Sequence, residues 1–270
     1  MKIFVDSADL DEIKQTYEWG VANGVTTNPS LLKKAVEKRV KAGEQLDLKK
    51  YIKNILKTAK GTPVSLEVTA TNAEGMIEQG KKLFKMFNRV AKNVYIKIPI
   101  NPAFKDGDNT HFDGIKAIRE LARHKIPVNC TLVFTPEQAW LAAKAGAAFI
   151  SPFAGRIDDD LRKGSKFNKT DYYPQEGKKK GASILNDNGI FSGVELVKEC
   201  VKIMQLHDLK TEVLAASLRN TRQVRECALV GSHIATLPFS VIKDMLKHHK
   251  TYEGMEKFTA DIVKEYEELK

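Results

Sequence analysis

Short segments rich in β-branched residues alternate with amphipathic helical segments along the whole chain, and this alternation limits the possible folds more than any other feature. A strand followed by a helix and another strand is the unit from which parallel sheets are built. Eight such units can be counted, which predicts a single (β/α)8 TIM barrel of the α/β class. The expected strands are residues 3–5, 24–26, 64–68, 94–98, 128–133, 148–151, 213–216 and 234–237.

The length and composition fit one barrel with two additions. The chain has 270 residues, of which 42% are hydrophobic, and such barrels usually need about 250 residues. We therefore expect one domain over residues 1–270. Residues 158–185 indicate an inserted basic loop after the sixth strand, either a lid or a mobile surface loop. Residues 250–270, with Phe258 and Ile262 on one face, predict an extra C-terminal helix.

Three helix starts are indicated by capping residues. Thr71 with Glu74 has the pattern of a capping box ahead of residues 76–87. Thr135 is followed by proline, which is typical of an N-cap with proline at the first helical position. Asp47 is expected to cap a helix that precedes the third strand.

The net charge restricts the class of partner. The chain carries 44 Lys and Arg against 34 Asp and Glu, a net charge of +10. Such an excess favours anionic partners, which include nucleic acids and phosphorylated metabolites. The basic residues are spread along the chain and form no nucleic-acid-binding motif, so we expect no nucleic acid partner. A steep fall in nucleic acid affinity with rising salt would support the alternative of a basic nucleic-acid-binding protein.

Cysteines and apolar segments bear on the cellular compartment. Cys130, Cys200 and Cys227 are odd in number and lie far apart, which fits reduced thiols and gives no zinc site. No run of about 18 apolar residues occurs, and a strand-like segment begins after two residues, which leaves no room for a signal peptide. We therefore expect a cytoplasmic protein with no membrane partner.

Polar residues gather at the carboxyl ends of the predicted strands, where TIM barrels carry their active sites. Because the side chains of a strand alternate between its two faces, polar residues of one parity are expected to point into the barrel. Their convergence would form a polar site at one end of the barrel. These residues, with one aromatic neighbour, are Asp6, Thr26, Asn28, Glu67, Asn129, Thr131, Ser151, Phe153, Ser217 and Arg219.

Lys97 is the most informative position, because it lies inside a predicted strand between Ile96 and Ile98. Lysine is seldom buried without a specific role. Burial disfavours the charged form of an amine, which makes such a lysine a nucleophile toward carbonyl carbons. A Schiff base with a carbonyl substrate is one interpretation. A lysine that pairs with a carboxylate, or that lies at a solvated mouth, is the other.

Two carboxylates are candidates to assist Lys97. Asp6 and Glu67 would supply one group for proton abstraction and another for the water that imine formation releases, provided that the barrel brings them together. Each has a structural alternative, Asp6 as the cap of the next helix and Glu67 as the ion-pair partner of Lys97. Asn28, which precedes Pro29, could likewise serve only as a turn residue.

Two arginines suit a phosphate group. Arg156 and Arg219 follow the sixth and seventh strands, and guanidinium groups bind phosphate oxygens in pairs. The alternative is that both are surface charges. Motifs of dinucleotide, NTP, zinc protease and serine hydrolase sites do not occur, so these classes have no support in the sequence.

Seven separated motifs resemble those of the transaldolase family. They occur in the family's order and cover most of the chain: FVDSAD, GVTTNPS, LEVTA, IKIP, NCTLVF, SPFAGRID and LAASLRN. The resemblance implies a barrel enzyme of the pentose phosphate pathway that acts on sugar phosphates. It also implies that neither a metal nor an organic cofactor takes part.

The resemblance further implies a role for each site residue. Lys97 would attack C2 of a ketose phosphate, fructose 6-phosphate or sedoheptulose 7-phosphate, and Asp6 would take the proton of the C4 hydroxyl. An aldose phosphate then leaves, and a dihydroxyacetone enamine stays on Lys97 until a second aldose phosphate accepts it. Glu67 and Thr131 would position the water of dehydration. The three-carbon unit and the phosphate would be held by Asn28, Asn129 and Ser151, and by Arg156, Ser217 and Arg219.

A sister group, the fructose 6-phosphate aldolases, resembles transaldolases in fold and lysine but usually has Gln and Tyr where this chain has Glu67 and Phe153. These residues favour a transaldolase over the alternative, a fructose 6-phosphate aldolase-type class I aldolase. A barrel that binds sugar phosphates without catalysis is a further alternative, against which the intact Asp6, Glu67 and Lys97 count. Small family members form rings through the C-terminal helix and longer ones tend to be dimers, so we expect a homo-oligomer.

Overall fold

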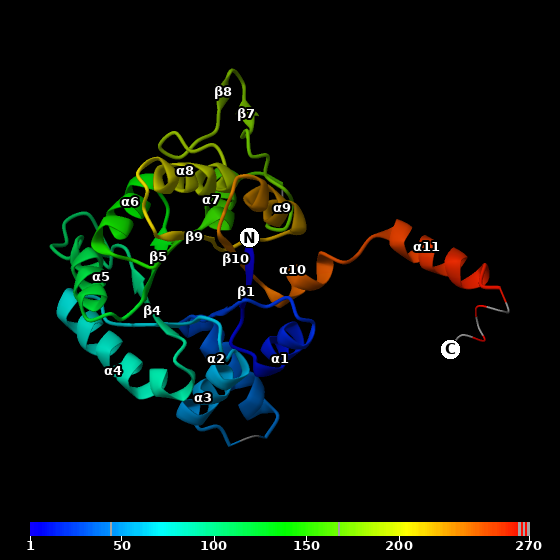
Figure 1. Ribbon diagram of the computed structural model, residues 1–270. Coiled ribbons are helices and arrows are strands. Elements are labelled where there is room, and N and C mark those ends of the chain that lie inside the picture. The colour runs from blue at the N-terminus through cyan, green and yellow to red at the C-terminus, as the bar shows by residue number, and fades with distance from the viewer. Residues whose placement is uncertain (44, 167, 264–265, 267, 269–270) are drawn as a thin grey trace.

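Eight parallel strands close into a barrel in the computed structural model, which describes residues 1–43, 45–166, 168–263, 266 and 268. Figure 1 shows the helices surrounding the strands. The order around the barrel is β1-β10-β9-β6-β5-β4-β3-β2, and β7 and β8 form a separate two-stranded sheet. The closed parallel barrel confirms the predicted fold class.

The barrel strands begin and end within one residue of the predicted ranges. They are β1 (Lys2–Asp6), β2 (Val25–Thr26), β3 (Val64–Glu67), β4 (Val94–Pro99), β5 (Val128–Val133), β6 (Phe149–Pro152), β9 (Glu212–Ala215) and β10 (Ile234–Leu237). The helices are α1 (Leu10–Glu18), α2 (Pro29–Lys41), α3 (Leu48–Thr58), α4 (Ala73–Ala91), α5 (Asp113–Arg123), α6 (Pro136–Ala145), α7 (Ala154–Leu161), α8 (Gly193–Leu206), α9 (Thr221–Leu229), α10 (Phe239–Asp244) and α11 (His249–Ala260).

The barrel interior has two layers of different chemistry. Near the amino ends of the strands the aromatic rings of Phe4, Tyr95 and Phe149 pack together, with the Phe149 ring centroid 4.6 Å from that of Tyr95 and 5.9 Å from that of Phe4. These rings close one end of the barrel. Because side chains alternate along a strand, the residues two positions further point the same way. In β1, β4 and β6 these residues are Asp6, Lys97 and Ser151.

Two of the three predicted helix caps are confirmed and one is wrong. Thr135 forms a capping box at the start of α6, and Asp47 accepts hydrogen bonds from backbone N–H groups at the start of α3. The cap of α4 is not Thr71 but Asn72, whose side chain accepts a hydrogen bond from the Gly75 N–H. Both residues are good caps, and only the backbone path out of β3 decides between them.

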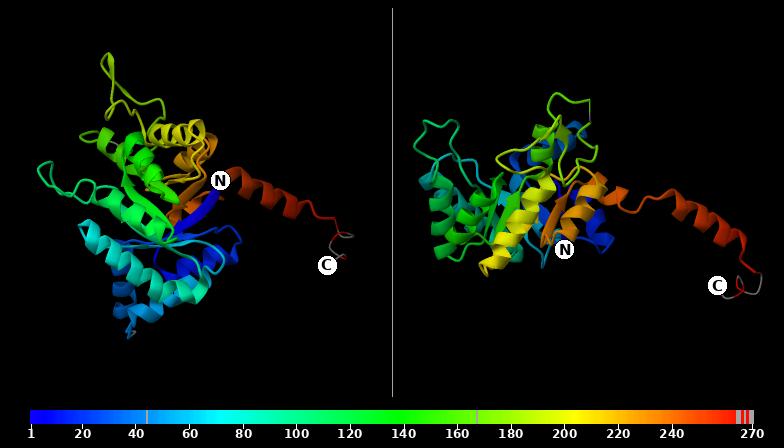
Figure 2. Two further views of the ribbon diagram at one scale, coloured as in Figure 1. Left: turned by 60° about the vertical axis from the view of Figure 1, so that its left-hand side comes forward. Right: turned by 90° about the horizontal axis from the view of Figure 1, so that it is seen from above.

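The segment after α7 contains a hairpin that the sequence did not indicate. β7 (Lys179–Lys180) pairs antiparallel with β8 (Ser183–Ile184), and the hairpin projects from the barrel in Figure 1. In the right panel of Figure 2 the N-terminus lies at one end of the barrel and this segment rises at the other end. The segment therefore lies on the side of the strands' carboxyl ends.

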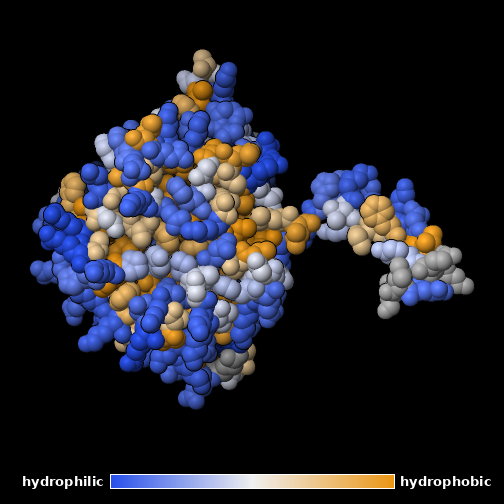
Figure 3. All heavy atoms as spheres, in the orientation of Figure 1, coloured by the Kyte–Doolittle hydropathy of each residue, from blue (hydrophilic) through white to orange (hydrophobic). Residues whose placement is uncertain are grey.

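The C-terminal helix stands away from the barrel. None of the residues of α11 is buried, and Figure 3 shows an arm that extends from the body of the molecule. The helix predicted over residues 250–270 ends at Ala260, and Ile262 lies beyond it. Residues 264–265, 267 and 269–270 lie outside the described residues.

The three cysteines are free and buried. Among the described residues, no helix combines the length and the hydrophobicity that crossing a membrane requires.

Candidate active site

A cavity of about 290 Å³ opens at the carboxyl ends of the barrel strands. Most residues predicted for the site line this cavity, whereas Glu67, Asn129 and Thr131 do not line it and lie on the neighbouring strands β3 and β5. The predicted residues that line it are Asp6, Thr26, Asn28, Lys97, Ser151, Phe153, Arg156, Ser217 and Arg219. Segments far apart in sequence are therefore brought together as the strand parity predicted.

Lys97 lies in β4 with only 7% of its side chain exposed. Its register partner in β3 is Glu67, and the Lys97 Nζ lies 3.1 Å from the Glu67 Oε2. The Nζ also donates to the Thr27 carbonyl oxygen at 3.4 Å. The structural alternative for Glu67, an ion pair with Lys97, is thus observed, and it places a carboxylate beside the only reactive amine that β4 presents to the cavity.

Asp6 ends β1 and lines the same cavity as Lys97. The Thr26 hydroxyl donates to the Asp6 Oδ1 at 2.7 Å, and Thr26 also bonds the Thr236 hydroxyl. Burial raises the pKa of Asp6, although the Lys97 charge, the Thr26 hydrogen bond and the Arg219 charge act in the opposite direction. A carboxyl with a raised pKa beside an amine is suited to proton transfer.

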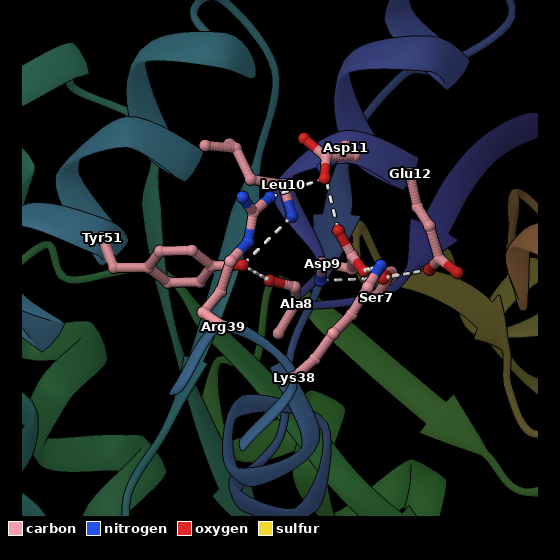
Figure 4. Close-up of polar contacts among 9 residues, drawn as sticks. All are labelled: Ser7, Ala8, Asp9, Leu10, Asp11, Glu12, Lys38, Arg39 and Tyr51. Carbon is pink, nitrogen blue, oxygen red and sulfur yellow. Dashed lines mark hydrogen bonds and ion pairs between the residues drawn. The ribbon is translucent and has the colours of Figure 1, made fainter. Parts of the chain in front are cut away.

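The alternative role of Asp6 as a helix cap is wrong, because Asp9 caps α1. Figure 4 shows the polar contacts that fix the turn after Asp6. The Tyr51 hydroxyl donates to the Ala8 carbonyl at 2.8 Å and accepts from the Leu10 N–H, and Lys38 pairs with Asp9 at 2.5 Å. The turn that follows the candidate base is therefore anchored to α2 and α3.

A buried hydrogen-bond row continues behind the cavity. The Ser151 hydroxyl donates to the Asn129 Oδ1 at 2.7 Å, and the Asn129 amide donates to the Ser65 hydroxyl at 3.1 Å. Thr131 is fully buried, and its hydroxyl has no hydrogen-bond partner within the described part of the chain. The pairing of β5 with β6 shifts register between Cys130 and Val133, and such a bulge re-aims the side chain that lies in it.

The candidate phosphate-binding residues are Arg156, in α7, and Arg219, in the loop after β9. Arg219 donates from Nη2 to the Asp159 Oδ2 at 2.9 Å, and the Arg156 guanidinium lies 5.1 Å from the centroid of the Phe153 ring. A Cβ at Gly155 would lie 1.9 Å from the Ser217 carbonyl oxygen, so only glycine allows α7 to approach the loop after β9 this closely. Both arginines line the same cavity, Arg156 with an exposed side chain, and their role toward phosphate stays a prediction.

Asn28 has two roles. Its side chain caps α2 by accepting from the Leu31 N–H at 2.9 Å, as the turn alternative required, and it also lines the cavity. Ser30 and Lys34 line the cavity from α2, and Thr236 lines it from β10. The sequence analysis missed these three. The parity of the eighth strand could have identified Thr236, whereas the two α2 residues depend on the orientation of that helix.

No group of three or more His, Cys, Asp or Glu side chains in the described part of the chain is arranged to hold a metal ion. The cavity is lined by the amines of Lys97 and Lys34, the Asp6 carboxyl group, hydroxyls and two guanidinium groups, and the Glu67 carboxyl lies beside Lys97.

Comparison with known proteins agrees with this set of groups. The family model described as transaldolase/fructose-6-phosphate aldolase matches residues 3–270. A probable transaldolase of Caldicellulosiruptor saccharolyticus is 40% identical over 97% of this chain and 96% of its own length, and one of Chlorobaculum parvum is 42% identical over 97% of both chains. A probable transaldolase of Thermoplasma volcanium is 38% identical over 97% of this chain and 95% of its own length. This chain therefore belongs to the transaldolase/fructose-6-phosphate aldolase family.

Proposed function

We propose that the protein is a transaldolase, which transfers a dihydroxyacetone unit from a ketose phosphate to an aldose phosphate through a Schiff base on Lys97. The observation that carries the proposal is the buried Lys97, paired with Glu67 at 3.1 Å, in a cavity that Asp6 and two arginines also line. An amine that is held away from water beside proton-transfer groups suits imine chemistry.

The reaction begins at the ketose carbonyl. The Lys97 amine, after giving a proton to Glu67, adds to C2 and forms a carbinolamine. The carbinolamine then loses water, for which Glu67 returns the proton to the departing hydroxyl. The unpartnered hydroxyl of Thr131 is suited to hold this water. The products of this stage are a protonated imine on Lys97 and one molecule of water.

Cleavage follows when Asp6, as carboxylate, takes the proton of the C4 hydroxyl. The electrons of the O–H bond form the aldehyde, those of the C3–C4 bond move to the imine, and the aldose phosphate leaves. A dihydroxyacetone enamine stays on Lys97, and attack of its carbon on a second aldose phosphate reverses the steps. The linked Ser151 and Asn129 suit the hydroxyls of the retained unit, with Thr26 and Asn28 nearby.

Arg156 and Arg219 suit the phosphate at the far end of the sugar, with Ser217 on the same loop as Arg219. Arg219 already holds a carboxylate, Asp159, in the geometry of a charge-assisted hydrogen bond. A phosphate dianion would compete with Asp159 for the same guanidinium. This arrangement supports phosphorylated substrates over free sugars.

The alternative is a fructose 6-phosphate aldolase-type class I aldolase, which would release free dihydroxyacetone. Release requires water to attack the imine after the enamine has been protonated. Phe153 lines the cavity with an apolar ring and offers no hydroxyl to deliver that proton. This residue favours transfer over release.

Trapping with borohydride tests the Schiff base. Incubation with fructose 6-phosphate and borohydride should abolish activity and add a three-carbon fragment to Lys97, because a reduced imine cannot hydrolyse. Lys97→Met should neither react nor become labelled. Lys34→Met is the matched control, because Lys34 is a second lysine of the cavity, and this variant should still be labelled at Lys97. Label on Lys34, or near-normal turnover by Lys97→Met, would show that the assignment is wrong.

We also propose that the protein is a cytoplasmic homo-oligomer in which α11 packs against a second copy of the chain. The three buried, free thiols support a reducing compartment. Isolated helices of about 12 residues are marginal in water, and α11 has this length without a buried residue. Tyr252, Met255 and Phe258 of this helix are 55–71% exposed, which supports burial in a partner.

A further inference from the structure

The segment after α7 encloses a second cavity of about 210 Å³, distinct from the one at the barrel mouth. Four of its lining residues are cationic, and none of the described residues that line it is acidic. The lining residues are Leu161, Arg162, Lys163, Gly164, Ser165, Tyr173, Lys178, Lys180 and Leu185. A small cavity with this charge favours an anion.

Arg162 is the most buried of the four cations, with 7% of the residue exposed. Its Nη1 donates to the Asn168 carbonyl at 2.7 Å and to the Lys169 carbonyl at 3.2 Å. Its Nε and Nη2 are buried and have no hydrogen-bond partner among the described residues. In a planar guanidinium these two nitrogens share one edge, and their parallel N–H groups match two oxygens of an oxyanion.

Two of the cations lie near the Tyr173 ring. The guanidinium carbon of Arg162 lies 5.7 Å from the ring centroid and the Lys178 Nζ lies 5.9 Å from it. Burial and the Arg162 charge lower the pKa of Lys178, while the Asp171 charge raises it. The like charges of Arg162 and Lys178 thus repel one another, and a bound anion would relieve this repulsion.

We propose that this cavity is an anion site that binds a phosphate dianion, either free phosphate or the phosphate group of a small metabolite. A dianion matches a site of four cations better than a carboxylate does, and its tetrahedral oxygens can bond the Arg162 edge and a lysine together. The unpartnered edge of Arg162 is the decisive feature, because buried N–H groups without acceptors are rare and costly.

The proposed anion site is connected to the cavity at the barrel mouth by α7 and the segment that follows it. Asp159 and Arg162 belong to the same end of α7, and the Lys169 Nζ lies 3.9 Å from the Asp159 Oδ2, which also binds Arg219. The Asn220 amide donates to the Thr170 carbonyl at 3.0 Å. An anion bound to Arg162 therefore contacts the segment that borders Arg219, a candidate phosphate-binding residue of the active site.

The test measures phosphate binding by calorimetry in a double variant, Arg156→Ala with Arg219→Ala, so that the barrel mouth contributes no phosphate site. One phosphate per chain should still bind at constant ionic strength. Adding Lys178→Gln and Lys180→Gln should weaken this binding by about a hundredfold, about tenfold for each charge-assisted contact. Lys166→Gln with Lys179→Gln is the matched control, because these exposed lysines of the same segment do not line the cavity.

Two further arms define the ligand and the role of Arg162. Glycerol 3-phosphate in place of phosphate distinguishes a metabolite from the free ion, since a phosphate monoester should bind more tightly if the site extends beyond the phosphate group. Arg162→Lys keeps the charge but loses the paired edge, and should weaken binding about tenfold. The proposal is overturned if no phosphate binds in the background variant, or if the control pair weakens binding as much as the cavity pair.

Discussion

Single residues decide what the barrel can do, and the ion pair of Lys97 and Glu67 is the clearest case. Both side chains are largely buried at the same level of adjacent strands, and their nitrogen and oxygen lie 3.1 Å apart. A buried ion pair is weak evidence for stability, because desolvation offsets much of the Coulomb attraction. Stability alone therefore does not account for this pair, which agrees with the proposed role of Lys97.

Phe153 is the residue at which transfer and release can be distinguished. Phe153→Tyr places a hydroxyl at the cavity, so protonation of the enamine and loss of free dihydroxyacetone should increase about tenfold or more relative to transfer. The measurement is the ratio of dihydroxyacetone to sedoheptulose 7-phosphate formed from fructose 6-phosphate and erythrose 4-phosphate. Phe134→Tyr is the control, because the Phe134 ring lies 5.7 Å from that of Phe153 without lining the cavity. Equal rates of release and transfer in the native protein would instead identify an aldolase.

At the scale of elements, the short strands determine where the polar side chains of the cavity lie, and hydrogen bonds at the helix starts hold them in place. β2 has only two residues, yet it carries Thr26 into contact with Asp6 and is followed directly by α2, which Asn28 caps. The turn between them is short and hydrogen-bonded. The side chains that line the cavity from α2 are therefore held by the same residue that begins the helix.

The observed cap of α4 leads to a stability prediction. Asn72→Ala should lower the free energy of unfolding by about 1 kcal/mol, because the Gly75 N–H loses its 2.8 Å acceptor. Thr71→Ala, one residue earlier, should change it by less than about 0.5 kcal/mol. Urea unfolding of both variants is the measurement. A larger loss of unfolding free energy for Thr71→Ala would show that Thr71 caps α4, as the capping-box pattern predicted.

At the scale of the whole molecule, a buried carboxyl connects three helices on one side of the barrel. Asp158 in α7 accepts from the Gly193 N–H of α8 at 2.7 Å and from the Gln223 side chain of α9. Gln223 in turn accepts from the Arg219 N–H at 2.7 Å. Burial raises the pKa of Asp158 to about 6 despite these hydrogen bonds.

This pKa gives a pH dependence with a definite sign. Because the folded pKa exceeds the ordinary value of 3.8, the folded state holds the proton more tightly, and the contribution of Asp158 to stability falls as pH rises. The native free energy of unfolding, relative to that of Asp158→Asn, should decrease by about 2 kcal/mol between about pH 4 and pH 6. Urea unfolding across this range measures the difference, with Asp160→Asn, at an exposed position of α7, as the control for loss of one charge. A difference that grows with pH would contradict the burial of an ionisable Asp158.

Assembly is the other property of the whole molecule. If α11 packs against a second copy, Phe258→Asp should shift the protein toward the monomer, because a charge in an apolar interface is costly. Lys257→Asp, on the adjacent position of the same helix, is the control for helix propensity and charge. Light scattering at several protein concentrations measures the mass. An unchanged mass for Phe258→Asp would mean that α11 is not part of the interface.

The sequence by itself determined the barrel, because eight β-branched segments with helices between them have one common solution, and side-chain parity within each strand identified Asp6, Lys97 and Ser151 as inward residues. Only the tertiary structure decided which groups meet. The pairing of Lys97 with Glu67 depends on the register between strands, and the contact of Arg219 with Asp159 depends on the close approach of α7 to the loop after β9 at Gly155. The orientation of α2 brings Ser30 and Lys34 to the cavity. The fold of the inserted segment leaves one edge of Arg162 without a hydrogen-bond partner among the described residues. Periodicity reports which face of an element is buried, whereas register and loop geometry arise from contacts between residues distant in the chain, and no local pattern contains them.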